Sequence, residues 1–214
     1  MSSSIDFSIE LEMSFLTNAL SRLSREVTIC YVRRGDPYYY ERVEELLHSL
    51  KKMSSDRVVV KNEIPEAIKS LANRFQSSPI LSIETGYGNR LRFVGWMIGK
   101  LEKLVIEAVC ISGESLVPYK LSESQREMLK RFGGEIDLYV LPGHACYRLG
   151  RMLIHLAYEV FSLNINIIDA LEAGKELEKF EYDGFPVVIL NNSKVVLNEV
   201  PDSIEELIES LAKQ

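Results

Sequence analysis

The side chains of this sequence best suited to covalent chemistry are those of its three cysteines. Cys30 lies within VTICYV and Cys110 within LVIEAVCISG, two apolar stretches in which a free cysteine is ordinarily buried. Cys146 comes two residues after His144 and is followed by Arg148. In the first turn of a helix these neighbours would lower the pKa of a thiol. Cys146 is therefore the candidate for a reactive nucleophile, and the alternative is a small side chain buried against a sheet.

Metal and hydrolase sites are not expected from these residues. His144 and Cys146 supply two ligands, whereas structural zinc needs about four. The other histidines, His48 and His155, fall inside predicted helices. A Cys–His hydrolase dyad also lacks an acidic residue that could orient the histidine. The sequence predicts neither a metal nor a cofactor.

The composition favours a cytoplasmic globular protein. The 214 residues carry 31 acidic and 25 basic side chains, and the formal charge of −6 disfavours a nucleic-acid-binding protein. No apolar run approaches the roughly 18 residues of a membrane-spanning helix. The opening MSSSIDFSIELEM does not resemble a secretory signal, and three scattered cysteines do not resemble a disulfide framework. We expect no contact with membranes, and the sequence does not indicate an oligomeric state.

Patterns typical of strands and helices alternate along the chain. In the first half they predict a helix at Ile5–Leu23, a strand at Val27–Val32, a helix at Tyr38–Met53, a strand at Arg57–Lys61, a helix at Ile64–Phe75, a hairpin of Pro79–Ile83 with Arg90–Val94, and a helix at Trp96–Ile111. In the second half they predict a helix at Ser122–Arg131, a strand at Ile136–Leu141, a helix at Cys146–Phe161, a strand at Ile165–Asp169, a helix at Leu171–Phe180, a hairpin of Val187–Leu190 with Val195–Leu197, and a helix at Ser203–Ala212.

The two halves repeat the order βαβαββα at an offset of 107 residues. Pro79 falls on Pro186, and each proline opens an apolar strand, PILSI and PVVIL. The helix start at Pro37–Tyr40 falls on His144–Tyr147. Two equal copies indicate tandem domains that arose by duplication, because the repeats of solenoid proteins are shorter.

This element order, with a proline opening the third strand, resembles the thioredoxin/glutaredoxin pattern. The tandem form resembles the archaeal glutaredoxin-like protein disulfide oxidoreductases, most specifically in the stretches ERVEELLHSL, RLRFVGWMIGKLEKLVIEAVCISGESL and DLYVLPGHACYRLGRMLIHLA. The resemblance implies an α/β fold of two tandem thioredoxin-like domains, each a central mixed β-sheet flanked by helices. The domains are expected at residues 1–115, with an extra N-terminal helix, and 116–214.

The chemistry of that family requires Cys-x-x-Cys at the start of each active-site helix. Here the first window reads Pro37-Tyr38-Tyr39-Tyr40 and contains no cysteine. The second window reads His144-Ala145-Cys146-Tyr147, so its single cysteine lies one place out of register. Neither window can close a disulfide, and we expect no dithiol–disulfide oxidoreductase activity.

The prolines of the family pattern are retained. The resemblance implies that Pro79 and Pro186 are both cis, and that Ser78 and Phe185 present backbone groups to an extended substrate peptide. The run Tyr38–Tyr40 has two interpretations. Tyr40 could fill the space of a missing cysteine while a neighbour is exposed, or the run could form an aromatic contact surface.

The function expected from these observations is non-catalytic binding of a protein or peptide. The residues expected to bind it are Ser78, Pro79, Phe185, Pro186, Tyr38, Tyr39 and His144. The alternative is a monothiol redox protein that performs thiol–disulfide exchange through Cys146, with stable mixed disulfides because no resolving thiol is near.

Overall fold

The computed structural model describes residues 5–85, 88–130, 134–192, 194–197 and 199–212. The first half contains α1 (Met13–Leu20), β1 (Val27–Val32), α2 (Pro37–Met53), β2 (Val58–Lys61), the 3-10 turn η1 (Glu66–Ile68), α3 (Lys69–Arg74), β3 (Ile80–Thr85), β4 (Gly88–Val94) and α4 (Lys100–Ser112). The second half contains α5 (Glu123–Lys130), β5 (Gly134–Val140), α6 (His144–Glu159), β6 (Leu163–Asp169), α7 (Gly174–Leu177), β7 (Val187–Leu190), β8 (Lys194–Leu197) and α8 (Ile204–Ala212).

The repeat expected from the sequence is present. Strand β1 begins at Val27 and β5 at Gly134, and helices α2 and α6 begin at Pro37 and His144, so both pairs are 107 residues apart. The predicted division between residues 115 and 116 falls in the segment that joins α4 to α5. That division into two domains stays a prediction.

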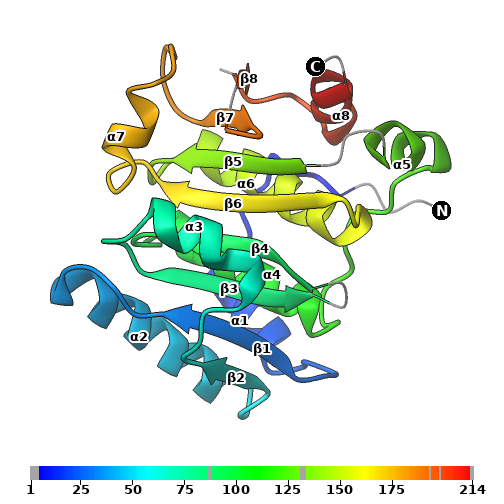
Figure 1. Ribbon diagram of the computed structural model, residues 1–214. Helices are drawn as coiled ribbons and strands as arrows, with labels where there is room; N and C mark the ends of the chain where they lie inside the picture. Colours follow the sequence, from blue (N-terminus) through cyan, green and yellow to red (C-terminus); the bar gives the residue numbers. More distant parts are fainter. Residues whose placement is uncertain (1–4, 86–87, 131–133, 193, 198, 213–214) are drawn as a thin grey trace.

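The two halves share one β-sheet of eight strands in the order β2-β1-β3-β4-β6-β5-β7-β8. The halves meet where β4 pairs with β6 in parallel, from Leu91 opposite Ile165 to Val94 opposite Ile168. Figure 1 shows this junction in the middle of the sheet. The sequence analysis predicted a sheet for each half and gave no sign of this pairing, which fixes the halves side by side.

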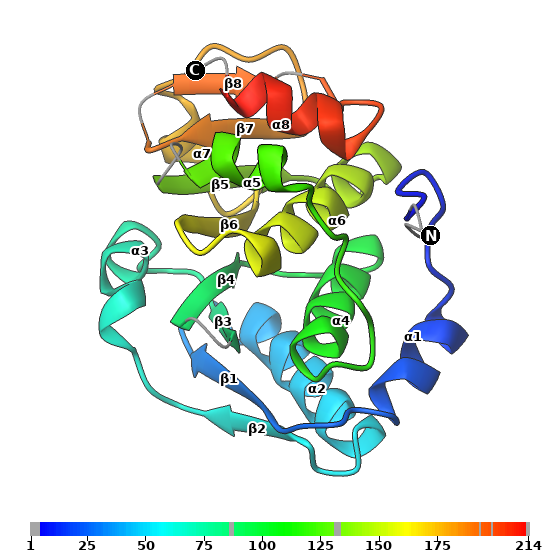
Figure 2. The same cartoon turned by 90° about the vertical axis from the view of Figure 1, so that its right-hand side faces the viewer.

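Helices cover both faces of the sheet (Figure 2). One apolar core contains side chains of α1, α2, α4, α6 and α8, with Leu16, Leu104 and Leu153 fully buried in it. A smaller core on the other face contains Ile68 and Leu71 beside α3, and Leu177 of α7. Strands buried on both faces explain why the apolar runs VTICYV and PVVIL lack a polar alternation.

The first helix is shorter than the predicted Ile5–Leu23. Only α1 is helical, and residues 5–11 form an irregular N-terminal segment, with a turn at residues 7 and 8, that crosses to the second half. There the Arg151 guanidinium donates to the carbonyl of Ile9 at 2.8 Å, and the Tyr147 hydroxyl accepts from the backbone N–H of Leu11 at 3.2 Å. These tertiary bonds take up backbone groups that a helix would otherwise pair internally.

Three other helices are also shorter than predicted. Helix α4 starts at Lys100 instead of Trp96, because Gly99 has a φ of 58° and interrupts the helical backbone before it. The helix predicted at Ile64–Phe75 is split into η1 and α3. The helix predicted at Leu171–Phe180 is limited to α7.

A buried ion cluster joins the two halves on the α4/α6 face. The Arg151 guanidinium donates to both carboxylate oxygens of Glu107, with contacts of 2.9–3.1 Å. His155 Nε2 lies 3.1 Å from Glu107 Oε1, and His155 Nδ1 accepts from the Tyr119 backbone N–H at 2.8 Å. Burial favours the neutral carboxyl, but the hydrogen bonds and charges of His155 and Arg151 outweigh it and hold the pKa of Glu107 below its usual value.

A second polar cluster joins the halves on the α3 face. Arg92, Asn166 and Asp137 stand opposite one another in a row across β4, β6 and β5. Asn166 accepts from Arg92 at 3.1 Å and donates to Asp137 at 2.6 Å. Arg74 of α3 closes the row with a 2.6 Å contact to Asp137. The junction between the halves is therefore held by charged and amide groups on both faces.

Replacing Glu107 by Gln tests the first cluster. The substitution leaves the Arg151 charge buried and uncompensated, so we expect a loss of about 3 kcal/mol in unfolding free energy at pH 7. The lowered pKa means that the contribution of Glu107 is complete above the unfolded-state pKa of about 4.3 and is lost as the pH falls below it. Urea unfolding at pH 7, and at steps from pH 5 to pH 3, measures both effects.

The exposed Glu209 provides the control, since Glu209→Gln should change the unfolding free energy by less than about 0.5 kcal/mol. A difference between wild type and Glu107→Gln that stays constant from pH 5 to pH 3 would show that Glu107 is not the ionised partner of the cluster.

Candidate functional site

The two windows and the two prolines singled out from the sequence lie at one edge of the sheet. Strands β1, β4, β5 and β6 run in the same direction, and β3 and β7 run against them. The carboxyl ends of the first four strands and the amino ends of the other two therefore share an edge, which we call the carboxyl edge and which lies at the left in Figure 1. The windows Pro37–Tyr40 and His144–Tyr147, and both prolines, are placed there by this topology.

The three cysteines are reduced and buried. Cys146, in the first turn of α6, is only 3% exposed, and its sulfur accepts a hydrogen bond from the Leu141 backbone N–H at 3.4 Å. Burial raises the pKa of the Cys146 thiol, so the lowered pKa expected from the sequence is wrong. The side chain turns into the apolar core, where loss of hydration outweighs the favourable helix terminus. The expected burial of Cys30 and Cys110 is confirmed.

The first window begins with a well-formed helix start. The Asp36 carboxylate accepts a hydrogen bond from the Tyr38 backbone N–H at 2.8 Å, and Pro37 occupies the first turn, where its missing N–H carries no penalty. Gly35 has a φ of 88°, and a Cβ there would lie 2.1 Å from the carbonyl oxygen of Ser77. Glycine is required at this turn because the backbone of the proline loop passes so close.

Aromatic rings occupy the first window, at the start of α2. Tyr38 and Tyr39 pack against each other with ring centroids 5.6 Å apart, and both contact Trp96, at 5.4 and 5.5 Å. Tyr38 is 55% exposed. Tyr40 turns away from this cluster, is half-buried and carries the Arg33 guanidinium 4.2 Å above its ring. The half-buried Tyr40 fits the interpretation as a space-filling side chain, and the exposed Tyr38 fits the interpretation as a contact surface.

The two proline loops differ. The Phe185–Pro186 bond is cis as expected, whereas the Ser78–Pro79 bond is trans, so the prediction of cis at Pro79 is wrong. Ser78 is 2% exposed and its hydroxyl donates to the Glu172 carboxylate of the second half at 2.7 Å. The first proline loop faces Glu172 and passes close to Gly35. The contact with Glu172 comes from the other half, so the sequence pattern of one half could not predict it.

The second window keeps an exposed histidine and a buried tyrosine. His144 is the first residue of α6 and is exposed. Tyr147 is fully buried beneath the N-terminal segment. Beside this window the rings of Tyr182 and Phe185 lie 5.5 Å apart, with Tyr182 37% exposed and Phe185 half-buried. The carboxyl edge thus exposes aromatic surface at both windows.

Two contributors to this edge were missed by the sequence analysis. Trp96 directly follows β4, and its position after a strand that ends at the carboxyl edge is the signal that could have found it. Gly95 before it has a φ of 90°, and a Cβ there would meet Asp169 and Glu172 of the second half. Glu172 had no signal in the sequence, because its contact with Ser78 depends on the joining of the two halves.

The described residues contain no group of three or more histidine, cysteine, aspartate or glutamate side chains placed to hold a metal ion. Among the same residues, no helix has both the length and the apolar character needed to cross a bilayer.

Comparison with known proteins identifies the fold. No protein-family model matches the chain, and neither does any curated protein. Among solved structures, the NTD N/C domain of alkylhydroperoxide reductase AhpF from Enterococcus faecalis has a TM-score of 0.74 and 14% identity, with 92% of this chain and 96% of that chain covered. A protein disulfide oxidoreductase from Aeropyrum pernix has a TM-score of 0.65 and 14% identity, with 99% and 94% covered. The expected fold of tandem thioredoxin-like units is confirmed.

The burial of the thiols predicts slow alkylation. Burial raises the pKa of Cys30 to about 11 and of Cys110 to about 12, and it raises that of Cys146 as well. In native protein at pH 8 we expect iodoacetamide to label all three more than about 100-fold slower than a free thiol with a pKa of about 8.5. Mass spectrometry of timed samples measures each rate, and protein unfolded in urea provides the control. Rapid labelling of Cys146 alone would contradict its buried position.

Proposed function

We propose that this protein is a non-catalytic protein- or peptide-binding module on tandem thioredoxin-like folds, and that its partner docks at the carboxyl edge. One observation carries the proposal. The first window contains no sulfur and exposes the ring of Tyr38, while all three cysteines are buried. An edge with this surface and no accessible thiol can bind a peptide chain, but it has no group for thiol–disulfide exchange with that chain.

The composition of the edge favours a protein partner. Tyrosine and tryptophan provide large, rigid contact area at low conformational cost, and they are enriched where proteins bind one another. Tyr38, Trp96 and Phe185 line the edge from both halves. Strands β1 and β5, which lead into the two windows, are four strand spacings apart, or about 19 Å. An extended segment of about six residues would reach from one window to the other.

The two windows differ in what they offer such a segment. Ser78 and Pro79 are buried and Ser78 is bonded to Glu172, so the first window offers mainly its aromatic rings. The second window has the exposed His144 and the half-buried Phe185 beside the buried Pro186. These differences support a partner segment that contacts aromatic side chains at the first window and the residues before β7 at the second window.

Thiol exchange at Cys146 is the alternative, and its geometry is unfavourable. A mixed disulfide requires the sulfur to meet an incoming disulfide in line, which needs access to the sulfur. At 3% exposure and within hydrogen-bonding distance of the Leu141 backbone, the Cys146 sulfur lacks that access.

The first consequence is the lack of reductase turnover. With dithiothreitol as reductant, the protein should precipitate insulin no faster than dithiothreitol alone, because no resolving thiol stands beside Cys146. A Cys-x-x-Cys thioredoxin at the same concentration is the positive control. Turnover at a rate comparable to that control would refute the non-catalytic proposal.

The second consequence is that docking depends on the exposed rings. We expect a library of displayed dodecapeptides to yield binders whose affinity, measured by fluorescence anisotropy, falls about tenfold or more in Tyr38→Ser. Tyr182→Ser should lower the affinity of the peptides that extend to the second window. Phe161, which like Tyr38 is 55% exposed, precedes β6 at the opposite edge, and Phe161→Ser is the matched control. Enriched peptides that bind Tyr38→Ser and Tyr182→Ser as tightly as wild type would show that the docking surface lies elsewhere.

A further inference from the structure

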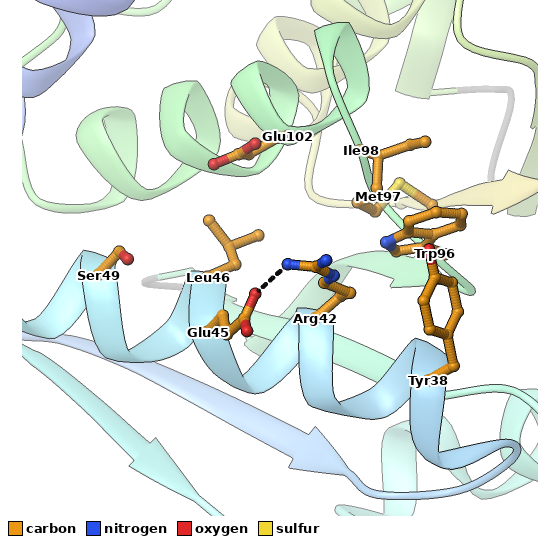
Figure 3. Close-up of a pocket in the computed structure, with 9 residues that line it drawn as sticks. All are labelled: Tyr38, Arg42, Glu45, Leu46, Ser49, Trp96, Met97, Ile98 and Glu102. Atoms are coloured by element: carbon orange, nitrogen blue, oxygen red, sulfur yellow. Dashed lines mark hydrogen bonds and ion pairs between the residues drawn. The ribbon is translucent and has the colours of Figure 1, made fainter.

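A groove beside the first window has the features of a side-chain-binding site. It lies between α2 and the start of α4 and has a volume of about 390 Å³ (Figure 3). Tyr38, Arg42 and Glu45 of α2 form one side, and Trp96, Ile98 and Glu102 form the other. Because Tyr38 belongs both to this groove and to the exposed aromatic cluster, the groove adjoins the proposed docking surface.

Aromatic rings form one end of the groove. Tyr38 packs edge-on against Trp96 with centroids 5.4 Å apart and an interplanar angle of 71°. The indole nitrogen of Trp96 is buried and has no hydrogen-bond partner among the described residues. Figure 3 shows this nitrogen on the side of the ring that faces the groove. A buried N–H without a partner costs free energy, so an acceptor such as a peptide carbonyl would be favoured there.

The other side of the groove carries unbalanced negative charge. Glu102 is half-buried, forms no ion pair with the described residues, and burial raises the pKa of its carboxyl. Across from it Arg42 is paired with Glu45 at 2.7 Å. The lining therefore has two carboxylates and one guanidinium.

The chain's own nearby lysines do not balance Glu102. Lys100 and Lys103, on the same turn of α4, contact the Glu10 carboxylate at 2.5 and 2.6 Å. Their hydrogen bonds lower the pKa of Glu10 to about 2, so both cations are committed to the N-terminal segment. Neither lysine is therefore available to pair with Glu102.

We propose that this groove binds the side chain of a lysine or arginine in an extended segment of a partner protein. The aliphatic stem lies along Tyr38 and Trp96, whose rings also attract the cation, and the charged head pairs with Glu102. The peptide carbonyl of the bound segment accepts from the Trp96 indole. The inference rests on the proposed function and specifies its partner as a basic segment, in accord with a formal charge of −6 for the whole chain.

Fluorescence gives a direct test, because Trp96 is the one tryptophan of the sequence. The probes are capped pentapeptides Ala-Ala-X-Ala-Ala in which X is lysine, arginine, norleucine or glutamate. We expect the lysine and arginine peptides to change the Trp96 emission saturably and to bind about tenfold more tightly than the norleucine peptide, a difference of about 1.4 kcal/mol. Raising the salt concentration should weaken only the basic peptides.

Variants assign the preference to the groove. Glu102→Gln should lower the affinity for the lysine peptide to that of the norleucine peptide, and the exposed Glu209→Gln should leave it unchanged. Arg42→Gln frees Glu45 and should strengthen lysine binding roughly threefold, as expected for a partly exposed ion pair. This gain cannot be produced by partial unfolding.

Two results would overturn the inference. One is equal affinity for the lysine and norleucine peptides, and the other is unchanged lysine binding in Glu102→Gln. If library-derived peptides still depend on Tyr38 while lysine gives no advantage, the docking surface stands and the basic partner is wrong. If the lysine peptide binds through Glu102 but library binding ignores Tyr38 and Tyr182, the groove is a cation site and the wider docking surface is wrong.

Discussion

The parallel pairing of β4 with β6 is the interaction on which the rest of the molecule depends. Each half alone would end in an open strand edge, and joining those edges yields one sheet of eight strands. Charged groups then close the junction on both faces, with Glu107, Arg151 and His155 on one side and the row of Arg92, Asn166 and Asp137 on the other. Buried ions favour one arrangement because any shift would leave a charge unpaired. The two windows consequently face the same way at a fixed separation.

This junction also explains why the halves have different surfaces. Segments of the second half reach over the first. There the Glu172 carboxylate accepts a hydrogen bond from the Ser78 hydroxyl, and its side chain lies close against Gly95. The N-terminal segment reaches the other way and lies over Tyr147 of the second window. Each window is thus altered by a segment from the opposite half.

Most of the fold could be predicted from the sequence, because the local patterns and the order of elements are repeated in the two halves. An offset of 107 residues predicted the starts of α2 and α6, and the apolar runs predicted the central strands. The features that could not be predicted depend on contacts between segments that are distant in the sequence. The N-terminal segment contains an amphipathic pattern, yet its polar backbone is bound by Arg151 and Tyr147 instead of forming a helix. The trans bond at Pro79 and the role of Glu172 likewise depend on the junction, which no local pattern encodes.

The error at Cys146 shows how sequence neighbours can mislead. His144 and Arg148 precede and follow it, but Arg148 contacts the carbonyl of Pro201 and the carboxylate of Asp202, and His144 is exposed on the surface. A helix terminus stabilises a thiolate only where the sulfur faces the free N–H groups and solvent, and here the side chain lies against the Leu141 backbone within the core. On the first half the same edge carries Tyr38 and Trp96 instead, together with Glu102, which has no ion pair within the described part of the chain. The chemistry available at the carboxyl edge is therefore that of rings and carboxylates, the groups on which the proposed binding of a partner depends.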